Sequence, residues 1–262
     1  MKSNFVSSVS HELRAPLASV RLMAENLDRG KIADEAKQRE YFRFIVQECR
    51  RLGALVENVL DFARIEQGRK EYDFEPTDIG ALVAQTVKLM GPAAAEKQVT
   101  LLLDAERRSA ELLLGSKKEA ISEPRAEPEL GAPLLDAPAI QQALINLLDN
   151  AIKHSPAGAT VVVGLTPPTP PKTTGNSHAS RFTLYVQDSG PGIPREEHEK
   201  IFQRFYRRGP ELRRETQGVG IGLSIVKHIA EAHGGRVVVE SAVGKGSRFA
   251  IELPVKPEEG AE

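Results

Sequence analysis

A histidine followed directly by a glutamate, in the segment SHELRAPL, is the first pair of side chains that could do chemistry. The Glu12 carboxylate can take the proton from one ring nitrogen of His11 while the other nitrogen attacks an electrophile. On a helix, His11 lies about 140° from Val6 and about 160° from Leu13, which predicts that it faces solvent. Pro16 has no N–H for the carbonyl of Glu12, which predicts a bend there. By themselves these residues favour an ordinary exposed histidine on a solvated helix face.

A second polar group lies in the segment NLLDNAIKHS. Asn146 and Asn150 are four residues apart, so they share one face of a helix. Two amide oxygens on one face can hold a hard divalent cation that keeps most of its waters. Lys153, with His154 beside it near the helix end, can meet a phosphate as a point charge. An ordinary polar helix face is the alternative interpretation.

The segment DSGPGI follows a predicted strand and places Asp188 at the strand end. A carboxylate there can accept a hydrogen bond from the amino group of a base. Gly190 and Gly192 have no Cβ atom, so a planar ring can approach the backbone. A simple Gly-Pro turn would explain the same residues.

The segment GVGIGL supplies Gly218, Gly220 and Gly222 at the start of a predicted helix. Glycines at a helix N-terminus expose N–H groups to an anion such as phosphate. The spacing is not the dinucleotide fingerprint, because no strand directly precedes it. We interpret GKGS, residues 244–247, as a hairpin turn rather than a ligand contact.

Residues 201–217 lie between the two glycine clusters and are aromatic at one end and basic over the rest. A basic, glycine-flanked segment can close over a polyphosphate, although a solvated run of charge is the ordinary alternative. The basic residues are Arg204, Arg207, Arg208, Arg213 and Arg214.

Two amphipathic helices joined by a short loop are predicted for the segment that carries His11. Apolar residues recur every seven positions in each helix, and Gly30 is the predicted stop of the first. One such hairpin buries little surface, so two copies are expected to form a four-helix bundle in a homodimer. The heptad positions are Val6, Leu13, Val20 and Leu27, then Ile45, Leu52 and Val59.

Beyond about residue 70, strands alternate with helices, which predicts a two-layer α/β sandwich with helices on one face of a mixed sheet. We expect a helical domain over 1–70 and a second domain over 71–256, with insertions near 106–133 and 167–180. The predicted helices span 79–94, 137–154 and 221–233, and the predicted strands span 99–103, 161–165, 182–187, 236–240 and 247–253.

Composition limits the partners and the location of the chain. Of 262 residues, 35 are Lys or Arg and 36 are Asp or Glu, so no net positive charge favours nucleic acid. A single cysteine excludes an intrachain disulfide, and no apolar run is long enough to span a bilayer. A soluble cytoplasmic protein without a membrane segment in this chain is expected.

In this order and spacing, the five segments resemble the catalytic core of the sensor histidine kinases of bacterial two-component systems. SHELRAPL resembles the phosphoacceptor box. NLLDNAIKHS, DSGPGI, IFQRFYR and GVGIGL resemble the asparagine, first glycine, phenylalanine and second glycine boxes of the Bergerat ATP-binding fold. The resemblance covers about residues 2–254 and implies this fold for the second domain.

The resemblance implies a role for each matching residue. His11 is the phosphoacceptor, Glu12 its general base, and Asn150 a Mg²⁺ ligand with Asn146 beside it. Asp188 reads the adenine amino group. The other implied contacts with ATP are phosphate contacts by Lys153, His154 and Arg207, base contacts by Gly190 and Gly192, and a lid hinge and phosphate-facing turn at Gly218, Gly220 and Gly222.

The implied activity is that of a protein-histidine kinase. It would use Mg²⁺ and ATP to phosphorylate His11, then pass the phosphoryl group to an aspartate of a response regulator receiver domain. The alternatives are another Bergerat-fold ATPase, a serine kinase of the same fold, or a scaffold that only docks receivers. The input signal, the regulator, and phosphorylation within or across the dimer stay open, as does an inner-membrane anchor in a longer parent protein.

Overall fold

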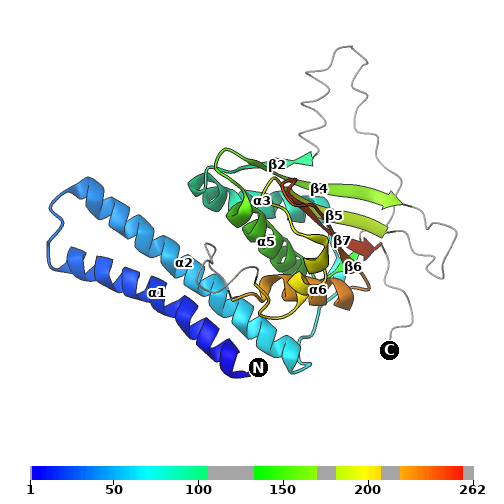
Figure 1. Ribbon diagram of the computed structural model, residues 1–262, viewed down its shortest axis with the longest axis horizontal. Coiled ribbons are helices and arrows are strands. Elements are labelled where there is room, and N and C mark those ends of the chain that lie inside the picture. Colours follow the sequence, from blue (N-terminus) through cyan, green and yellow to red (C-terminus); the bar gives the residue numbers. More distant parts are fainter. Residues whose placement is uncertain (1, 105–132, 170–180, 208–218, 256–262) are drawn as a thin grey trace, which may run out of the picture. The chain divides into compact units, whose positions relative to one another are not determined.

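The computed structural model describes residues 2–104, 133–169, 181–207 and 219–255 (Figure 1). The side chains of residues 2–8, His11 and residues 167–169 are outside this description. The chain forms two compact units. The first contains Met1–Lys70 together with Gln203–Ile225, and the second contains Glu71–Phe202 together with Val226–Glu262.

The first unit is built on a helical hairpin, as predicted, of α1 (Lys2–Asp28) and α2 (Glu35–Glu66). Gly30, at φ +63°, ends α1, and its N–H donates to the carbonyl of Leu27. Asp34 caps α2, because its carboxylate accepts from the backbone N–H of Ala36. Helix α1 runs through Pro16, which is buried.

A set of large apolar side chains on both helices of the hairpin stays exposed. Leu17 and Leu22 are 62% and 60% exposed, and Phe42 is 56% exposed. The hairpin therefore leaves apolar surface in contact with solvent, at positions other than the predicted heptad positions, which are half-buried where the structure describes their side chains. The exposed set is Leu17, Leu22, Phe42, Val46, Val56 and Leu60.

The second unit contains a five-stranded mixed sheet in the order β2-β4-β5-β7-β6. Strand β2 pairs with β4 in parallel, and the other neighbours are antiparallel. The strands are β2 (Thr100–Leu103), β4 (Thr160–Thr169), β5 (Arg181–Asp188), β6 (Arg236–Ser241) and β7 (Ser247–Pro254).

Three helices lie along one face of this sheet, so the predicted two-layer α/β architecture is confirmed (Figure 1). They are α3 (Ile79–Glu96), α5 (Ala137–His154) and α6 (Gly222–Ala232). Helix α5 has the most buried apolar face, because Ile140, Leu144 and Leu148 are fully buried. It therefore holds Asn146 and Asn150 on a rigid element.

Short elements were absent from the sequence-based prediction. Strand β1 (Glu75–Pro76) pairs with β3 (Leu134–Leu135) across 58 residues, and single-turn helices η1 (Arg195–Glu197) and η2 (Lys200–Phe202) follow β5. Two-residue strands carry no periodic pattern of their own, so pairing with a distant partner decides them.

The predicted insertion near 167–180 was placed too early, because β4 continues to Thr169. Its register against β5 shifts between Thr166 and Thr169, which brackets Pro167 and Pro168. Proline lacks an N–H, and a bulge accommodates it in a strand. Residues 170–180, and 105–132 of the other predicted insertion, lie outside the described part of the chain.

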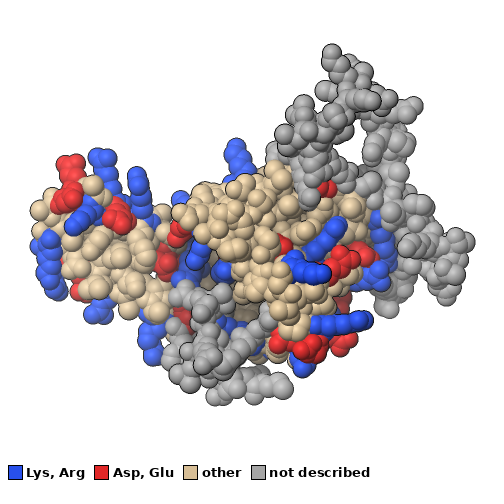
Figure 2. All heavy atoms as spheres, turned by 45° about the horizontal axis from the view of Figure 1, so that its top comes forward, with Lys and Arg blue, Asp and Glu red and all other residues tan. Residues whose placement is uncertain are grey.

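Charged side chains of both signs are interspersed on the face shown in Figure 2. This mixture agrees with a net charge of -1 for the whole chain. Among the described helices, none has the length and apolar composition that crossing a membrane requires.

A buried histidine connects the end of α6 with the start of α5. His233 is 5% exposed; its Nδ1 donates to the carbonyl of Ile229 at 2.7 Å, and its Nε2 accepts from the N–H of Asp136 at 3.1 Å. The Asp136 carboxylate caps α5 and also accepts from the N–H of Asp73. A neutral ring fits these partners, and burial lowers the pKa of His233 below its ordinary value of 6.5.

We expect stability to fall as the pH drops below about 6.5, because the unfolded chain then binds a proton at residue 233 that the folded chain resists. Urea unfolding of the full chain between pH 7.5 and 5.5 should show this effect as a slope of the free energy of unfolding against pH. The slope should shrink in His233→Gln and persist in His198→Gln, a histidine of the same unit. An unchanged slope in His233→Gln would assign the pH dependence to another group.

Candidate functional site

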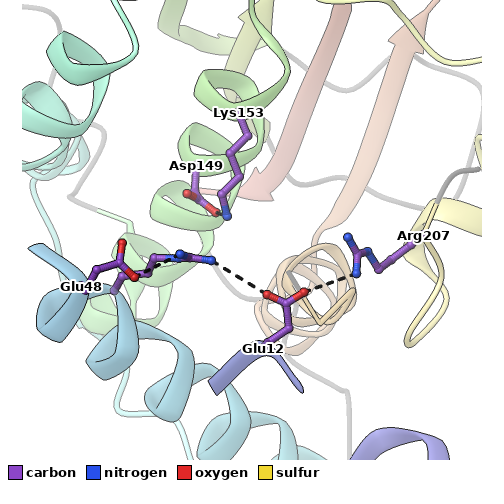
Figure 3. A network of polar contacts seen from close by, with 6 residues as sticks. Glu12, Glu48, Asp149, Lys153 and Arg207 are labelled. Atoms are coloured by element: carbon purple, nitrogen blue, oxygen red, sulfur yellow. Dashed lines mark hydrogen bonds and ion pairs between the residues drawn. The ribbon is translucent and has the colours of Figure 1, made fainter. Parts of the chain in front are cut away.

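Helix α1 carries His11 and Glu12 in the first unit. The His11 side chain lies outside the described residues, so its predicted solvent orientation stays a prediction. The Glu12 side chain is 17% exposed and is held by two guanidinium groups (Figure 3). Its Oε1 lies 3.4 Å from Nη1 of Arg207, and its Oε2 lies 3.9 Å from Nη2 of Arg51.

The segment Gln203–Arg207 belongs to the same compact unit as the hairpin. The ring of Phe205 packs edge-on against Phe62 of α2, with 5.4 Å between ring centroids. Arg204 pairs with Glu66 at 2.5 Å, also on α2. Phe205 adopts φ +64°, an unusual value for a residue with a side chain, and its N–H donates to the carbonyl of Gly220.

This arrangement gives Arg207 a partner that sequence reasoning did not predict. The phosphate contact that the resemblance implied stays a prediction, and in the structure Arg207 pairs with Glu12. The two residues are 195 positions apart, so no local pattern could indicate the pair.

Glycines of the second cluster lie at the beginning of α6. Gly220 has φ +77°, and a Cβ there would approach the carbonyl of Tyr206 to 3.0 Å. Gly222 is the first residue of α6, where backbone N–H groups have no partner within the helix. Gly218 lies outside the described residues.

Helix α5 presents the asparagine residues of the second unit. Asn146 is buried and Asn150 is half-buried, one turn apart as predicted. The Asn150 side chain forms no hydrogen bond with any residue in the described part of the chain, so its amide is available to a ligand. Lys153 pairs with Asp149 of the same helix at 2.5 Å (Figure 3). His154 is exposed.

A buried carboxylate ends β5. Asp188 is 8% exposed, and its Oδ1 accepts from the backbone N–H groups of Gly190 at 2.8 Å and Ser247 at 3.2 Å. No group of the described residues donates to Oδ2. Burial raises the pKa of Asp188, while the two amides and nearby His154 favour its charged form. One oxygen is therefore fixed, and the other can accept from a ligand.

Glycines make room for this carboxylate and for the turn after it. A Cβ on Gly190 would lie 2.6 Å from the carbonyl oxygen of His154. Gly192 has φ +70°, and a Cβ there would clash with the carbonyl oxygen of Ala242. Larger residues therefore do not fit at these two positions without moving the backbone.

The GKGS segment does more than the predicted hairpin turn between β6 and β7. A Cβ on Gly246 would clash with the carbonyl oxygen of Asp188, and Ser247 donates to its carboxylate. Antiparallel pairing of β5 with β7 places Asp188 opposite Ser247. Gly246 and Ser247 are thus site residues that sequence reasoning missed. Only the register between β5 and β7 could have identified these two residues, and the sequence alone does not fix that register.

Two family models match the chain. Residues 1–68 match the His Kinase A phospho-acceptor domain, and residues 135–257 match the histidine kinase-, DNA gyrase B- and HSP90-like ATPase. The first match contains His11 and Glu12, and the second contains α5, Asp188 and the glycine clusters. A phospho-acceptor domain next to the ATPase distinguishes the chain from the gyrase-like and HSP90-like members.

Relatives of known name support the same assignment. The chain is 31% identical to the circadian input-output histidine kinase CikA of Synechococcus elongatus, over 97% of this chain and 30% of CikA. It is 29% identical to the sensor-like histidine kinase SenX3 of Mycolicibacterium smegmatis, over 98% of this chain and 58% of SenX3. The chain therefore spans about a third to three fifths of these relatives.

A solved structure with the same architecture is full-length ShkA in complex with AMPPNP. It is 29% identical, with a TM-score of 0.58, over 95% of this chain and 45% of ShkA. The sequence motifs, both family models, the named relatives and this fold agree. The chain belongs to the histidine kinases and contains both domains of a sensor histidine kinase catalytic core.

Proposed function

We propose that this chain transfers the γ-phosphoryl group of ATP to His11 and then to an aspartate of a response regulator. The observation that carries this proposal is the Asp188 site, whose Oδ1 is fixed by two backbone amides while Oδ2 faces no donor of the described residues. A carboxyl oxygen in that state suits the exocyclic amino group of adenine as a hydrogen-bond acceptor. Gly190 and Gly192 allow the ring to approach the backbone.

We propose that the polar face of α5 holds the phosphates and their metal ion. The half-buried Asn150 amide fits a Mg²⁺ ligand, with Asn146 one turn away on the same face. No cluster of three or more His, Cys, Asp or Glu side chains in the described residues could hold a metal ion. An amide, waters and the nucleotide phosphates are thus the ligands expected here. When bound, Mg²⁺ would neutralise charge that develops on the phosphates.

The remaining cations and N–H groups are assigned to phosphate. We propose that Lys153 exchanges its pairing with Asp149 for a phosphate oxygen, and that His154 and the N-terminus of α6 at Gly220 and Gly222 add donors. Arg207 is proposed to reach the phosphates when it leaves Glu12. The same role is proposed for Gly218 on the basis of the motif.

We propose that residues 1–70 serve dimerisation and accept the phosphoryl group, and that residues 71–256 bind ATP. The two family models match residues 1–68 and 135–257. The proposed partner is a response regulator receiver domain. The solved complex of the histidine kinase ThkA with the response regulator TrrA shows such a pair in a protein of the same fold. A cytoplasmic location is proposed because ATP is the proposed substrate.

We propose that two copies form a homodimer through the exposed apolar set on α1 and α2. Six large apolar side chains on one hairpin are costly in water, and a second hairpin of the same sequence can cover them. A four-helix bundle would result.

The full chain should be a dimer at micromolar concentration by analytical ultracentrifugation. The double variant Leu22→Glu/Phe42→Glu should be shifted to monomer, because it would bury four carboxylates at the interface of a dimer. Leu89→Glu is the matched control, since Leu89 is 59% exposed on α3. A wild-type mass of one chain at high micromolar concentration would contradict the bundle.

Incubation of the full chain with ATP labelled on the γ-phosphate and Mg²⁺ tests the proposed activity. A phosphohistidine is lost in acid and kept in base, whereas a phosphoserine behaves in the opposite way. Label that survives acid would favour the serine kinase alternative. A chain that binds a receiver domain but takes no label would favour the alternative of a scaffold that only docks receivers.

A further inference from the structure

Four charged side chains of the first unit form an alternating chain, Glu48–Arg51–Glu12–Arg207 (Figure 3). The Glu48 Oε2 lies 3.3 Å from Nη1 of Arg51, whose Nη2 lies 3.9 Å from Oε2 of Glu12. Arg207 completes the chain at 3.4 Å from the other oxygen of Glu12. Each carboxylate faces a guanidinium group.

The hairpin explains why Arg51 lies opposite Glu12. In an antiparallel pair, residues at equal distances from the turn face each other, and both positions are about twenty residues from the middle of the 29–34 connection. Glu48 and Arg51 are three residues apart on α2, so they share one helix face. Glu48 is only 9% exposed, and a carboxylate so buried needs a cation. Arg51 is thus anchored on its own helix.

The anchoring has a consequence for Glu12. A glutamate side chain on a helix surface samples several rotamers, and a base acts only from the one that reaches its proton. Arg51 holds one Glu12 oxygen from α2, so this contact does not depend on the segment that carries Arg207. If Arg207 leaves for a phosphate, Glu12 keeps the Arg51 contact and frees Oε1.

We propose that Arg51 is a positioning residue for Glu12 in the phosphorylation of His11, with Glu48 as the anchor of Arg51. The inference rests on the proposed function. In that step one ring nitrogen of His11 forms a bond to the γ-phosphorus while the bond from that phosphorus to the bridging oxygen of ADP breaks. The proton on the other ring nitrogen passes to the Glu12 carboxylate. The products are phosphohistidine, ADP and protonated Glu12.

The test measures autophosphorylation of the full chain with labelled ATP in the variants Arg51→Ala and Arg51→Lys. Loss of orientation at Glu12 should lower the maximal rate about ten- to hundredfold and leave the KM for ATP unchanged. Arg51→Lys should recover part of the rate lost in Arg51→Ala. Lysine keeps the positive charge but lacks the two guanidinium nitrogens that contact Glu48 and Glu12 separately. Arg50→Ala is the matched control, since Arg50 is exposed on the same helix and should keep the wild-type rate.

A double-mutant cycle separates positioning from a merely structural role. In the Glu12→Gln background, Arg51→Ala should lower the autophosphorylation rate little further, because there is no longer a base to position. A full additional loss in that background, or a wild-type rate in Arg51→Ala, would overturn the proposal. Wild-type protein that takes no label on His11 would instead refute the proposed function itself, and with it the role of Arg51.

Discussion

His11→Ala should abolish stable phosphorylation of this protein and leave its affinity for ATP unchanged. The acceptor belongs to α1 in the first unit, whereas Asp188 and the asparagine face of α5 belong to the second. Replacing the imidazole removes the only nitrogen nucleophile of the SHELRAPL segment and touches no proposed contact with the nucleotide. Label from γ-phosphate-labelled ATP, and titration calorimetry with a non-hydrolysable ATP analogue, measure the two effects separately.

Ser10→Ala is the matched control for this variant. Ser10 directly precedes the histidine on α1 and is exposed, so it is the nearest alternative acceptor. It should keep the wild-type amount of label. Stoichiometric phosphate on His11→Ala, or its loss in Ser10→Ala, would remove His11 from its proposed role.

Asp188→Asn should weaken ATP binding about ten- to hundredfold. The asparagine Oδ1 can still accept from Gly190 and Ser247, so the fold of the turn should persist. The second oxygen becomes an NH₂ group, which meets the adenine amino group as donor against donor. A hydrogen bond to a charged group contributes about 1.5–3 kcal/mol, which corresponds to the expected change in Kd.

Titration calorimetry of the full chain with the same analogue measures this loss. Asp28→Asn, at the exposed end of α1, makes the identical chemical change far from the proposed site in sequence and should bind like wild type. Equal affinity of Asp188→Asn and wild type would show that Asp188 does not read the base.

Most of the helices and strands could be predicted from the sequence, because their signals are local. Gly30 ends α1, Asp34 caps α2, and Asp78 caps α3 through the N–H of Ala81, each within a few residues of the boundary. The sequence did not predict the pairing of β1 with β3 or the extension of β4 through two prolines. Each of these depends on a partner strand distant in sequence.

The sequence by itself determined which residues stand together along one helix or turn. His11 and Glu12 are adjacent, and Asn146 and Asn150 share a face because a helix repeats every 3.6 residues. Only the tertiary structure decided that Ser247 fixes Asp188, that His233 joins Asp136, and that Glu12 lies between Arg51 and Arg207. Strand register and packing between distant segments set these contacts, and no local period encodes them.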